Sequence, residues 1–194
     1  MINDLNSVGR DVQGLHECLE KTNFGLEELE DFLHFEIGSY TRNLIYRNEN
    51  YEMMAICWGI GHHTPIHDHN GQEGWIKVID GKVEESLYQV QMLNEDTFTA
   101  ELLKADQFAK GAVSHVNDEI AFHSIRNLNR GRSVTLHLYS LPISRCHIYD
   151  TKSGKRGVKV MSNYTEYGVK VSWEKVRGRH PDDPMQLKAC ELLP

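Results

Sequence analysis

The chain has 194 residues with 28 acidic and 21 basic side chains, which gives a formal net charge of −7 before histidine is counted. This length fits one large domain, and a composition of 40% hydrophobic and 25% charged residues excludes a mostly disordered chain. The acidic balance argues against nucleic-acid binding, and no run approaches 18 consecutive apolar residues, so we expect neither nucleic acid nor membrane as a partner.

The first part of the chain, residues 1–38, has the spacing of short helices. Apolar residues between Val8 and Phe35 recur three or four positions apart, which places them on one face of a helix. Polar and glycine residues at 23–25 interrupt this pattern. We therefore predict two or three short helices that pack against another layer.

From residue 40 the pattern changes to short apolar runs separated by turn signals such as Asp80-Gly81, a dipeptide that tolerates positive φ. Many short strands at roughly regular spacing indicate an antiparallel jelly-roll barrel. The predicted strands cover residues 41–46, 52–58, 64–69, 74–78, 82–90, 97–103, 121–127, 133–140 and 146–150.

These elements predict a mostly β protein that forms a single domain over residues 1–194. Residues 40–150 form the barrel core, and residues 151–194 form a C-terminal hairpin and tail. In this tail we expect residues 158–162 to pair with residues 167–173. The polar, proline-containing end that follows has no predicted structure.

The cysteines and the N-terminus both favour a cytoplasmic protein. The first residues lack a basic stretch followed by an apolar one, so we expect no secretory signal. The four cysteines are widely separated and form no CxxC pair, which is typical of reduced thiols. They are Cys18, Cys57, Cys146 and Cys190. We also favour a monomer.

Histidine is the unusual residue type, with 11 in the chain. His67 and His69 lie two apart in a predicted strand, so their rings point to one side, as chelation of a metal requires. His123 lies on a distant strand, and a barrel brings such strands to one interior. Asp68 faces the other way and is interpreted as structural. An isolated His-x-His pair is also common by chance, so this spacing alone does not decide the function.

Glycines, histidines and one asparagine recur at a characteristic spacing. They are Gly61, His67, His69, Gly74, Gly81, His123 and Asn127. This spacing resembles the two sequence motifs of cupins. Gly74 stands where many cupins carry a metal-binding glutamate, and Glu73 is one position away from that place. The PxG of the second motif is absent.

A further set of motifs lies within about residues 40–150. They are Tyr40-Thr41-Arg42-Asn43-Leu44, Cys57-Trp58-Gly59, Ile66-His67-Asp68-His69, Leu136-His137-Leu138-Tyr139-Ser140 and Cys146-His147. In these motifs the chain resembles the cysteine dioxygenase family, which are cupin-fold thiol dioxygenases. The resemblance implies a dioxygenase that uses Fe(II) and O2 to convert L-cysteine to cysteine sulfinate.

The resemblance also implies roles for individual residues. The implied Fe(II) ligands are His67, His69 and His123. Arg42 would bind the substrate carboxylate, for which its planar guanidinium is suited. Tyr40 and Cys146 would line the same pocket.

Thr135, His137 and Tyr139 alternate along one predicted strand and therefore face the same side. The family has a Ser-His-Tyr set here, so the resemblance implies a relay in which Tyr139 donates to developing charge at sulfur and oxygen. Many animal members carry a cysteine in place of Gly74, crosslinked to the tyrosine. Gly74 has no sulfur, so we predict an unmodified Tyr139, as in the pattern resembling bacterial members.

Several functions remain open at this point. The same chemistry could act on 3-mercaptopropionate or cysteamine, but related 3-mercaptopropionate dioxygenases have glutamine where this chain has Arg42, which favours cysteine. A zinc or manganese cupin isomerase or hydrolase is an alternative of another class. A non-catalytic small-molecule sensor is a third, although no helix-turn-helix pattern appears.

Overall fold

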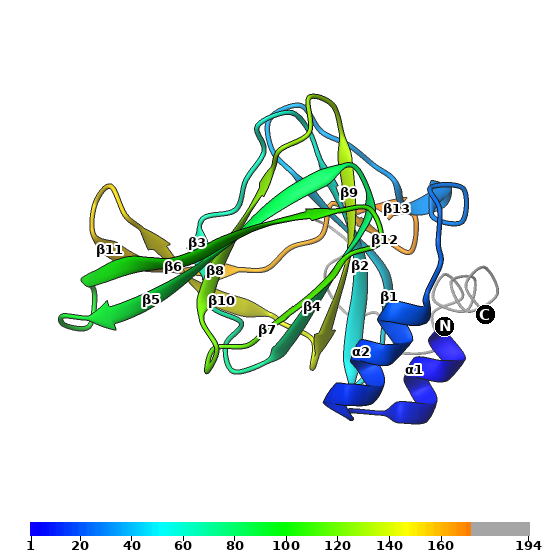
Figure 1. Ribbon diagram of the computed structural model, residues 1–194, viewed down its shortest axis with the longest axis horizontal. Helices are drawn as coiled ribbons and strands as arrows, with labels where there is room; N and C mark the ends of the chain where they lie inside the picture. The colour runs from blue at the N-terminus through cyan, green and yellow to red at the C-terminus, as the bar shows by residue number, and fades with distance from the viewer. Residues whose placement is uncertain (172–194) are drawn as a thin grey trace.

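The computed structural model describes residues 1–171, in which two short helices lie beside a body made of strands (Figure 1). The helical elements are α1 (Ile2–Val8), α2 (Val12–Lys21) and the 3-10 turn η1 (Glu30–Phe32). The Asp11 carboxylate accepts a backbone N–H of the first turn of α2 and caps its start. The predicted short helices are confirmed, although the second apolar stretch forms only a turn. Within residues 1–171, no helix has the length and apolar character needed to cross a membrane.

The strands form two sheets. The larger has the order β13-β12-β1-β2-β9-β4-β7, and the smaller has the order β11-β10-β3-β8-β5-β6. Neighbouring strands pair antiparallel, except that β1 and β12 are parallel. The bounds are β1 Thr41–Arg47, β2 Tyr51–Trp58, β3 Ile66–His67, β4 Glu73–Asp80, β5 Lys82–Met92, β6 Phe98–Ala109, β7 Val113–Val116, β8 Phe122–Asn127, β9 Ser133–Ser140, β10 Arg145–Asp150, β11 Lys155–Val160, β12 Thr165–Glu166 and β13 Val169–Lys170.

The prediction of a mostly β, antiparallel protein is confirmed, but the two sheets are not joined into a closed barrel over the described residues. Three local features also differ from the sequence prediction. The strand expected over residues 64–69 is only the two-residue β3, and β7 was not predicted. Residues 158–162 do not pair with residues 167–171. Instead β11 pairs with β10, and the short β12 pairs with β13. The remaining predicted strand residues, 172–173, lie outside the described part of the chain.

The larger sheet is covered on both faces, which explains why its central strands read as continuous buried runs. On β2, Met53 packs with Leu15 of α2 in one core cluster, whereas the adjacent Met54 packs with Ile125 of the smaller sheet in another. All eight residues of β9 are buried. Because side chains alternate along a strand, every second residue of β9 therefore faces the space between the sheets.

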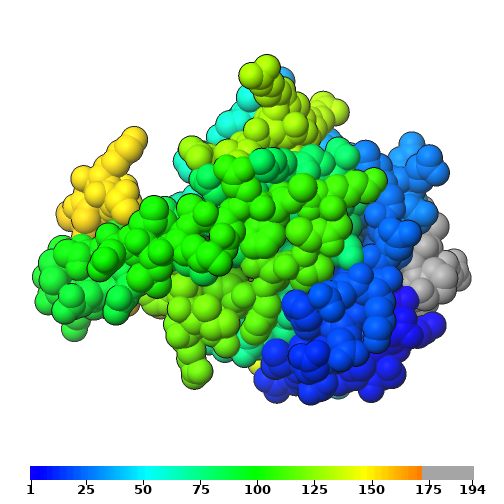
Figure 2. Space-filling model, viewed as in Figure 1, coloured from blue at the N-terminus to red at the C-terminus, as the bar shows by residue number. Residues whose placement is uncertain are grey.

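The predicted Asp80-Gly81 turn connects β4 to β5. Gly81 has φ of +80°, a conformation that favours glycine. From this turn β5 and β6 form a long hairpin that extends away from the rest of the body (Figure 2). The turn therefore fixes the residue at which β5 enters the smaller sheet.

We expect Gly81→Ala to lower the free energy of unfolding by about 3 kcal/mol, because a methyl group adds a clash to a strained φ. Its Cβ would lie 2.1 Å from Ser133 Oγ and 3.0 Å from Ser133 Cα. Gly111 has φ of +90° with no atom within 4 Å of a new Cβ, so Gly111→Ala should cost only about 1 kcal/mol. Urea unfolding of both variants checks this. Equal losses would contradict the role given to Ser133.

Candidate metal centre and substrate pocket

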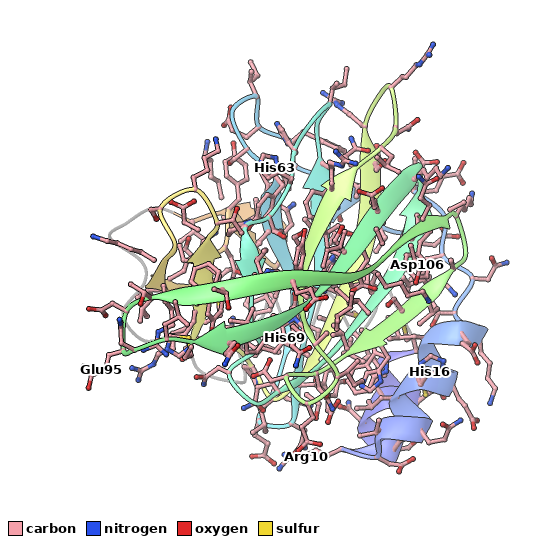
Figure 3. The ribbon with its side chains drawn as sticks, turned by 60° about the vertical axis from the view of Figure 1, so that its left-hand side comes forward. Arg10, His16, His63, His69, Glu95 and Asp106 are labelled. Carbon is pink, nitrogen blue, oxygen red and sulfur yellow. The ribbon has the colours of Figure 1, made fainter. Side chains whose placement is uncertain are left out.

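Three histidines converge between the sheets. His67 ends β3 and is the register partner of His123 on β8, while His69 follows two residues after His67. One ring nitrogen from each lies within 4.8 Å of the others, and the His123 ring centroid is 4.5 Å from that of His67 and 4.7 Å from that of His69. In Figure 3, His69 lies in the strand body, with His63 above it and His16 to the right on helix α2.

The structure thus brings together the three histidines that the sequence predicted as metal ligands, but one of them, His69, is oriented in a different way from the one expected. His69 lies outside the strand, so strand alternation does not orient it. A turn that follows β3 orients it instead. Asp118 accepts hydrogen bonds over 2.6 Å from the backbone N–H of His69 and from that of Gly71. This carboxylate therefore holds the turn in place.

Acceptors behind the rings determine which nitrogen of each is free. His67 Nδ1 lies 3.0 Å from the Pro65 carbonyl oxygen, and His123 Nδ1 lies 2.7 Å from Glu85 Oε1. Because these oxygens only accept, each Nδ1 carries the proton and leaves the Nε2 lone pair available. The Nε2 atoms of His69 and His123 are buried and have no hydrogen-bond partner.

The histidines are held in the form that binds metals. Burial, followed by the charge of His123, lowers the pKa of His67 to about 3, and the same two causes hold the pKa of His69 well below its usual value. Both rings are therefore neutral near pH 7. Imidazoles whose ring nitrogens converge, with the Nε2 atoms of His69 and His123 unpartnered, fit a divalent metal ion and leave open positions for further ligands.

Glu85 completes this arrangement from the smaller sheet. It is buried on β5 beside His123 and also accepts a hydrogen bond from Ser114 Oγ on β7. Burial acts to raise the pKa of Glu85, but hydrogen bonds from His123 and Ser114 outweigh it and lower the pKa overall. A carboxylate behind a ligating imidazole fixes the ring and increases its basicity. Sequence analysis missed Glu85, although an acidic residue at an inward-facing position of a strand was a usable signal.

Two acidic residues near the histidines have structural partners instead. Asp68 accepts hydrogen bonds over 2.8 Å from the backbone N–H of His147 and over 2.7 Å from its ring Nδ1, and so ties β10 to the turn. This agrees with the structural interpretation of Asp68. Glu73 is engaged by His115 and Asn117. It is not part of the metal-binding group found among the described residues.

A pocket opens beside the histidines, and the other predicted site residues surround it. Arg42, Tyr40, Tyr139 and Cys146 line it together with His67 and His123. The guanidinium carbon of Arg42 lies 5.8 Å from the centre of the Tyr139 ring, and Arg42 Nε is buried without a hydrogen-bond partner. An arginine with unused donors at a small cavity is suited to an anionic ligand.

A buried carboxylate stands behind this arginine. Glu52 lies 3.8 Å from Arg42 Nη2, and it accepts two hydrogen bonds from Arg47 and one from the backbone N–H of Ile143. Because Glu52 is fully buried, its oxygens need these donors in place of water. The carboxylate is thus mainly engaged by Arg47. Arg42 remains directed to the pocket.

The predicted relay is present on the inner face of β9. Trp58 Nε1 donates to Thr135 Oγ1 over 2.8 Å, Thr135 Oγ1 lies 2.8 Å from His137 Nε2, and His137 Nδ1 lies 3.0 Å from Tyr139 Oη. His137 Nε2 is the acceptor within reach of the Thr135 hydroxyl proton, so we assign Nδ1–H to His137. His137 then donates to Tyr139, whose own proton is left for the pocket. Trp58 was missed as the start of this chain.

Burial also fixes the protonation of the relay. It raises the pKa of Tyr139 to about 12, so the phenol keeps its proton near neutral pH. Burial, followed by the nearby charge of Arg42, holds the pKa of His137 well below its usual value. The relay is therefore neutral throughout and can donate one hydrogen bond into the pocket.

Comparison with known proteins identifies the family. A family model described as "Cysteine dioxygenase type I" matches residues 6–152. The chain belongs to this family.

Cysteine dioxygenase type 1 from Bos taurus is 31% identical over 140 residues, covering 70% of this chain and 68% of the relative. The Rattus norvegicus protein of the same name is 28% identical over 163 residues, covering 82% and 80%. A Klebsiella pneumoniae protein with a double-stranded β-helix domain has a TM-score of 0.48 and 10% identity, covering 70% of this chain and 95% of that one. The predicted membership of the cysteine dioxygenase family, and with it a dioxygenase enzyme, is confirmed.

In this family member Gly74 packs directly against a histidine of the metal-binding group. An added Cβ would lie 2.7 Å from His69 Cε1. We expect Gly74→Ala to displace this ring and to weaken metal binding at least about tenfold, as loss of ligand orientation does. Anaerobic titration with Co(II) measures the affinity, and circular dichroism checks the fold. Unchanged affinity would mean that the ring position is not set by this contact.

Buried His137 should also make the dioxygenase less stable in acid. The pKa of His137 is lowered in the folded protein, whereas in the unfolded chain it has the ordinary histidine value of about 6.5. Below that value the unfolded chain therefore binds more protons than the folded protein, and stability is lost as the pH falls through it. We expect the free energy of unfolding of metal-free protein to fall between about pH 7 and pH 5. His137→Gln should make this slope shallower. An identical slope in urea unfolding would refute the assignment.

Proposed function

We propose that this enzyme is a thiol dioxygenase that uses Fe(II) and converts L-cysteine and O2 to cysteine sulfinate. The observation that carries the proposal is a group of three converging imidazoles with no carboxylate among them, two of which have unpartnered Nε2 atoms, beside a pocket that holds an arginine. The thiol and both oxygen atoms appear in the product, so the sulfur is oxidised and O2 is reduced without another reactant.

His67, His69 and His123 would hold the metal. Three neutral ligands leave a divalent ion its full positive charge, which favours a thiolate as a further ligand. Bound there, Fe(II) would supply open coordination positions and the redox chemistry that joins thiol and O2. Glu85 and the Pro65 carbonyl keep two of the rings oriented for this task.

Arg42 and the relay would act on the substrate. The Arg42 guanidinium binds and orients the carboxylate, which places the sulfur toward the histidines. Tyr139 holds its proton at Oη and directs it into the pocket because His137 donates to that oxygen from behind. Such a prearranged donor stabilises charge that develops at sulfur and oxygen. Thr135 acts through His137 and not on the substrate.

Tyr40 and Cys146 would form the pocket wall. Burial raises the pKa of the Cys146 thiol to about 11, so this residue is a neutral thiol and not a nucleophile. Cys18 and Cys57 are free thiols as well. A reducing cytoplasm is the compartment that we propose for the enzyme.

Anaerobic loading with Fe(II), followed by oxygen uptake with cysteine, 3-mercaptopropionate and cysteamine, tests the proposal. We expect the fastest turnover with cysteine and, with ¹⁸O2, two labelled atoms in the product by mass spectrometry. Loading with zinc or manganese should give no oxygen uptake. A fully iron-loaded sample that consumes no oxygen with any thiol would overturn the proposal, and ligand binding without turnover would favour a sensor.

Arg42→Gln tests how the substrate is bound. We expect the KM for cysteine to rise at least about tenfold, because a charge-assisted hydrogen bond to the carboxylate is lost. The KM for cysteamine, which has no carboxylate, should change little. Arg145→Gln, at an exposed position of β10, is the matched control. A similar effect of Arg42→Gln on both thiols would argue against carboxylate binding by this residue.

A further inference from the structure

Strand β11 has the reverse of the usual distribution of polar and apolar side chains. Val158 and Val160 are 63% and 77% exposed, whereas Lys159 between them is half-buried and lines the pocket. An outer strand normally places lysine in solvent and valine inward, because a buried ammonium loses hydration. The reversed order costs stability and indicates that Lys159 acts in the pocket.

The ammonium group of Lys159 is held at the pocket by Tyr40. Nζ donates to Tyr40 Oη over 3.2 Å and lies 5.5 Å from the centre of the Tyr40 ring, which in turn packs on Trp58 at 5.0 Å. The register partner of Lys159 on β10 is Cys146, another lining residue. The side chain therefore extends along the pocket wall and not across the surface.

This contact determines what Tyr40 offers to a ligand. An ammonium only donates, so Tyr40 Oη accepts from Lys159 and must direct its own proton elsewhere. Among the described residues, no acceptor for that proton is within hydrogen-bond distance. Within residues 1–171, Tyr40 is therefore a donor without a partner, at the same cavity as Arg42.

The charges around the pocket also favour an anionic ligand. Arg42 and Lys159 both line it, while the Glu52 carboxylate, 3.8 Å from Arg42, is engaged by Arg47 and the backbone of Ile143. A cationic ligand group would meet two like charges there, and an anionic group would meet two cations and a hydroxyl donor.

We propose that Lys159 is a specificity-determining residue that orients the Tyr40 hydroxyl and completes, with Arg42, a three-part binding site for the anionic head group of the thiol. This inference rests on the proposed thiol dioxygenase function and adds to it a residue that selects carboxylate-bearing thiols and excludes cationic ones such as cysteamine. Lys159 acts partly through Tyr40 and partly by its own charge.

Lys159→Met tests the proposal, since methionine keeps the length of the side chain and removes the charge. We expect the KM for cysteine and for 3-mercaptopropionate to rise about tenfold, with kcat changed less than about twofold, as for the loss of a charge-assisted contact. The kcat/KM for cysteamine should stay the same or increase. Lys159→Arg should restore most of the selectivity. Lys155→Met, at an exposed position of the same strand, is the control.

Two further measurements separate this inference from its alternatives. If Lys159 acts through Tyr40, the two substitutions are not independent. The KM for cysteine in the double variant Lys159→Met, Tyr40→Phe should then rise by less than the product of the two single-variant increases. Calorimetric binding of cysteine to Co(II)-loaded protein without oxygen gives the same comparison without turnover, so it remains decisive even if the proposed reaction fails. Equal effects of Lys159→Met on cysteine and cysteamine, or no effect on either, would overturn the proposal.

Discussion

The hydrogen bonds behind the histidine rings are the constraint on which the site depends. An imidazole can bind a metal only through an unprotonated nitrogen, and a buried ring needs an acceptor for its remaining N–H. The Pro65 carbonyl and the Glu85 carboxylate meet this need for His67 and His123 and leave both Nε2 atoms toward one point. The convergence of the rings is thus a consequence of where acceptors lie in two different segments.

The two-sheet architecture makes the remaining parts of the site possible. Strand β9 is buried on both faces, with apolar residues under the helices and the relay residues between the sheets. In this interior an unsatisfied polar group is costly, and the contacts from Trp58 to Thr135 and onward to Tyr139 satisfy the groups of the relay in sequence. The same requirement leaves one proton, that of Tyr139, for the ligand.

The pocket region contains charged residues whose positions local sequence patterns do not predict. Glu52 is a fully buried carboxylate that would be unstable without Arg47, and Lys159 is a lysine on the inward side of an outer strand. Each departs from what its position in a strand favours. Such departures concentrate at functional sites, because binding an anion requires positive charge where packing alone would place apolar side chains.

Short-range patterns in the sequence determined the residue types of the centre, the strand-rich fold, the turn at Asp80-Gly81 and the alternation that aligns Thr135, His137 and Tyr139. These depend on neighbours along the chain, so they can be read from spacing. Only the tertiary structure decided the orientation of His69, the separation of the two sheets, and the positions of Glu85, Asp118 and Lys159. Those depend on how segments distant in sequence meet. A shift of one residue in strand register would have turned Glu85 and Lys159 to the opposite face, whereas His69 and Asp118 lie outside the strands, where alternation gives no orientation.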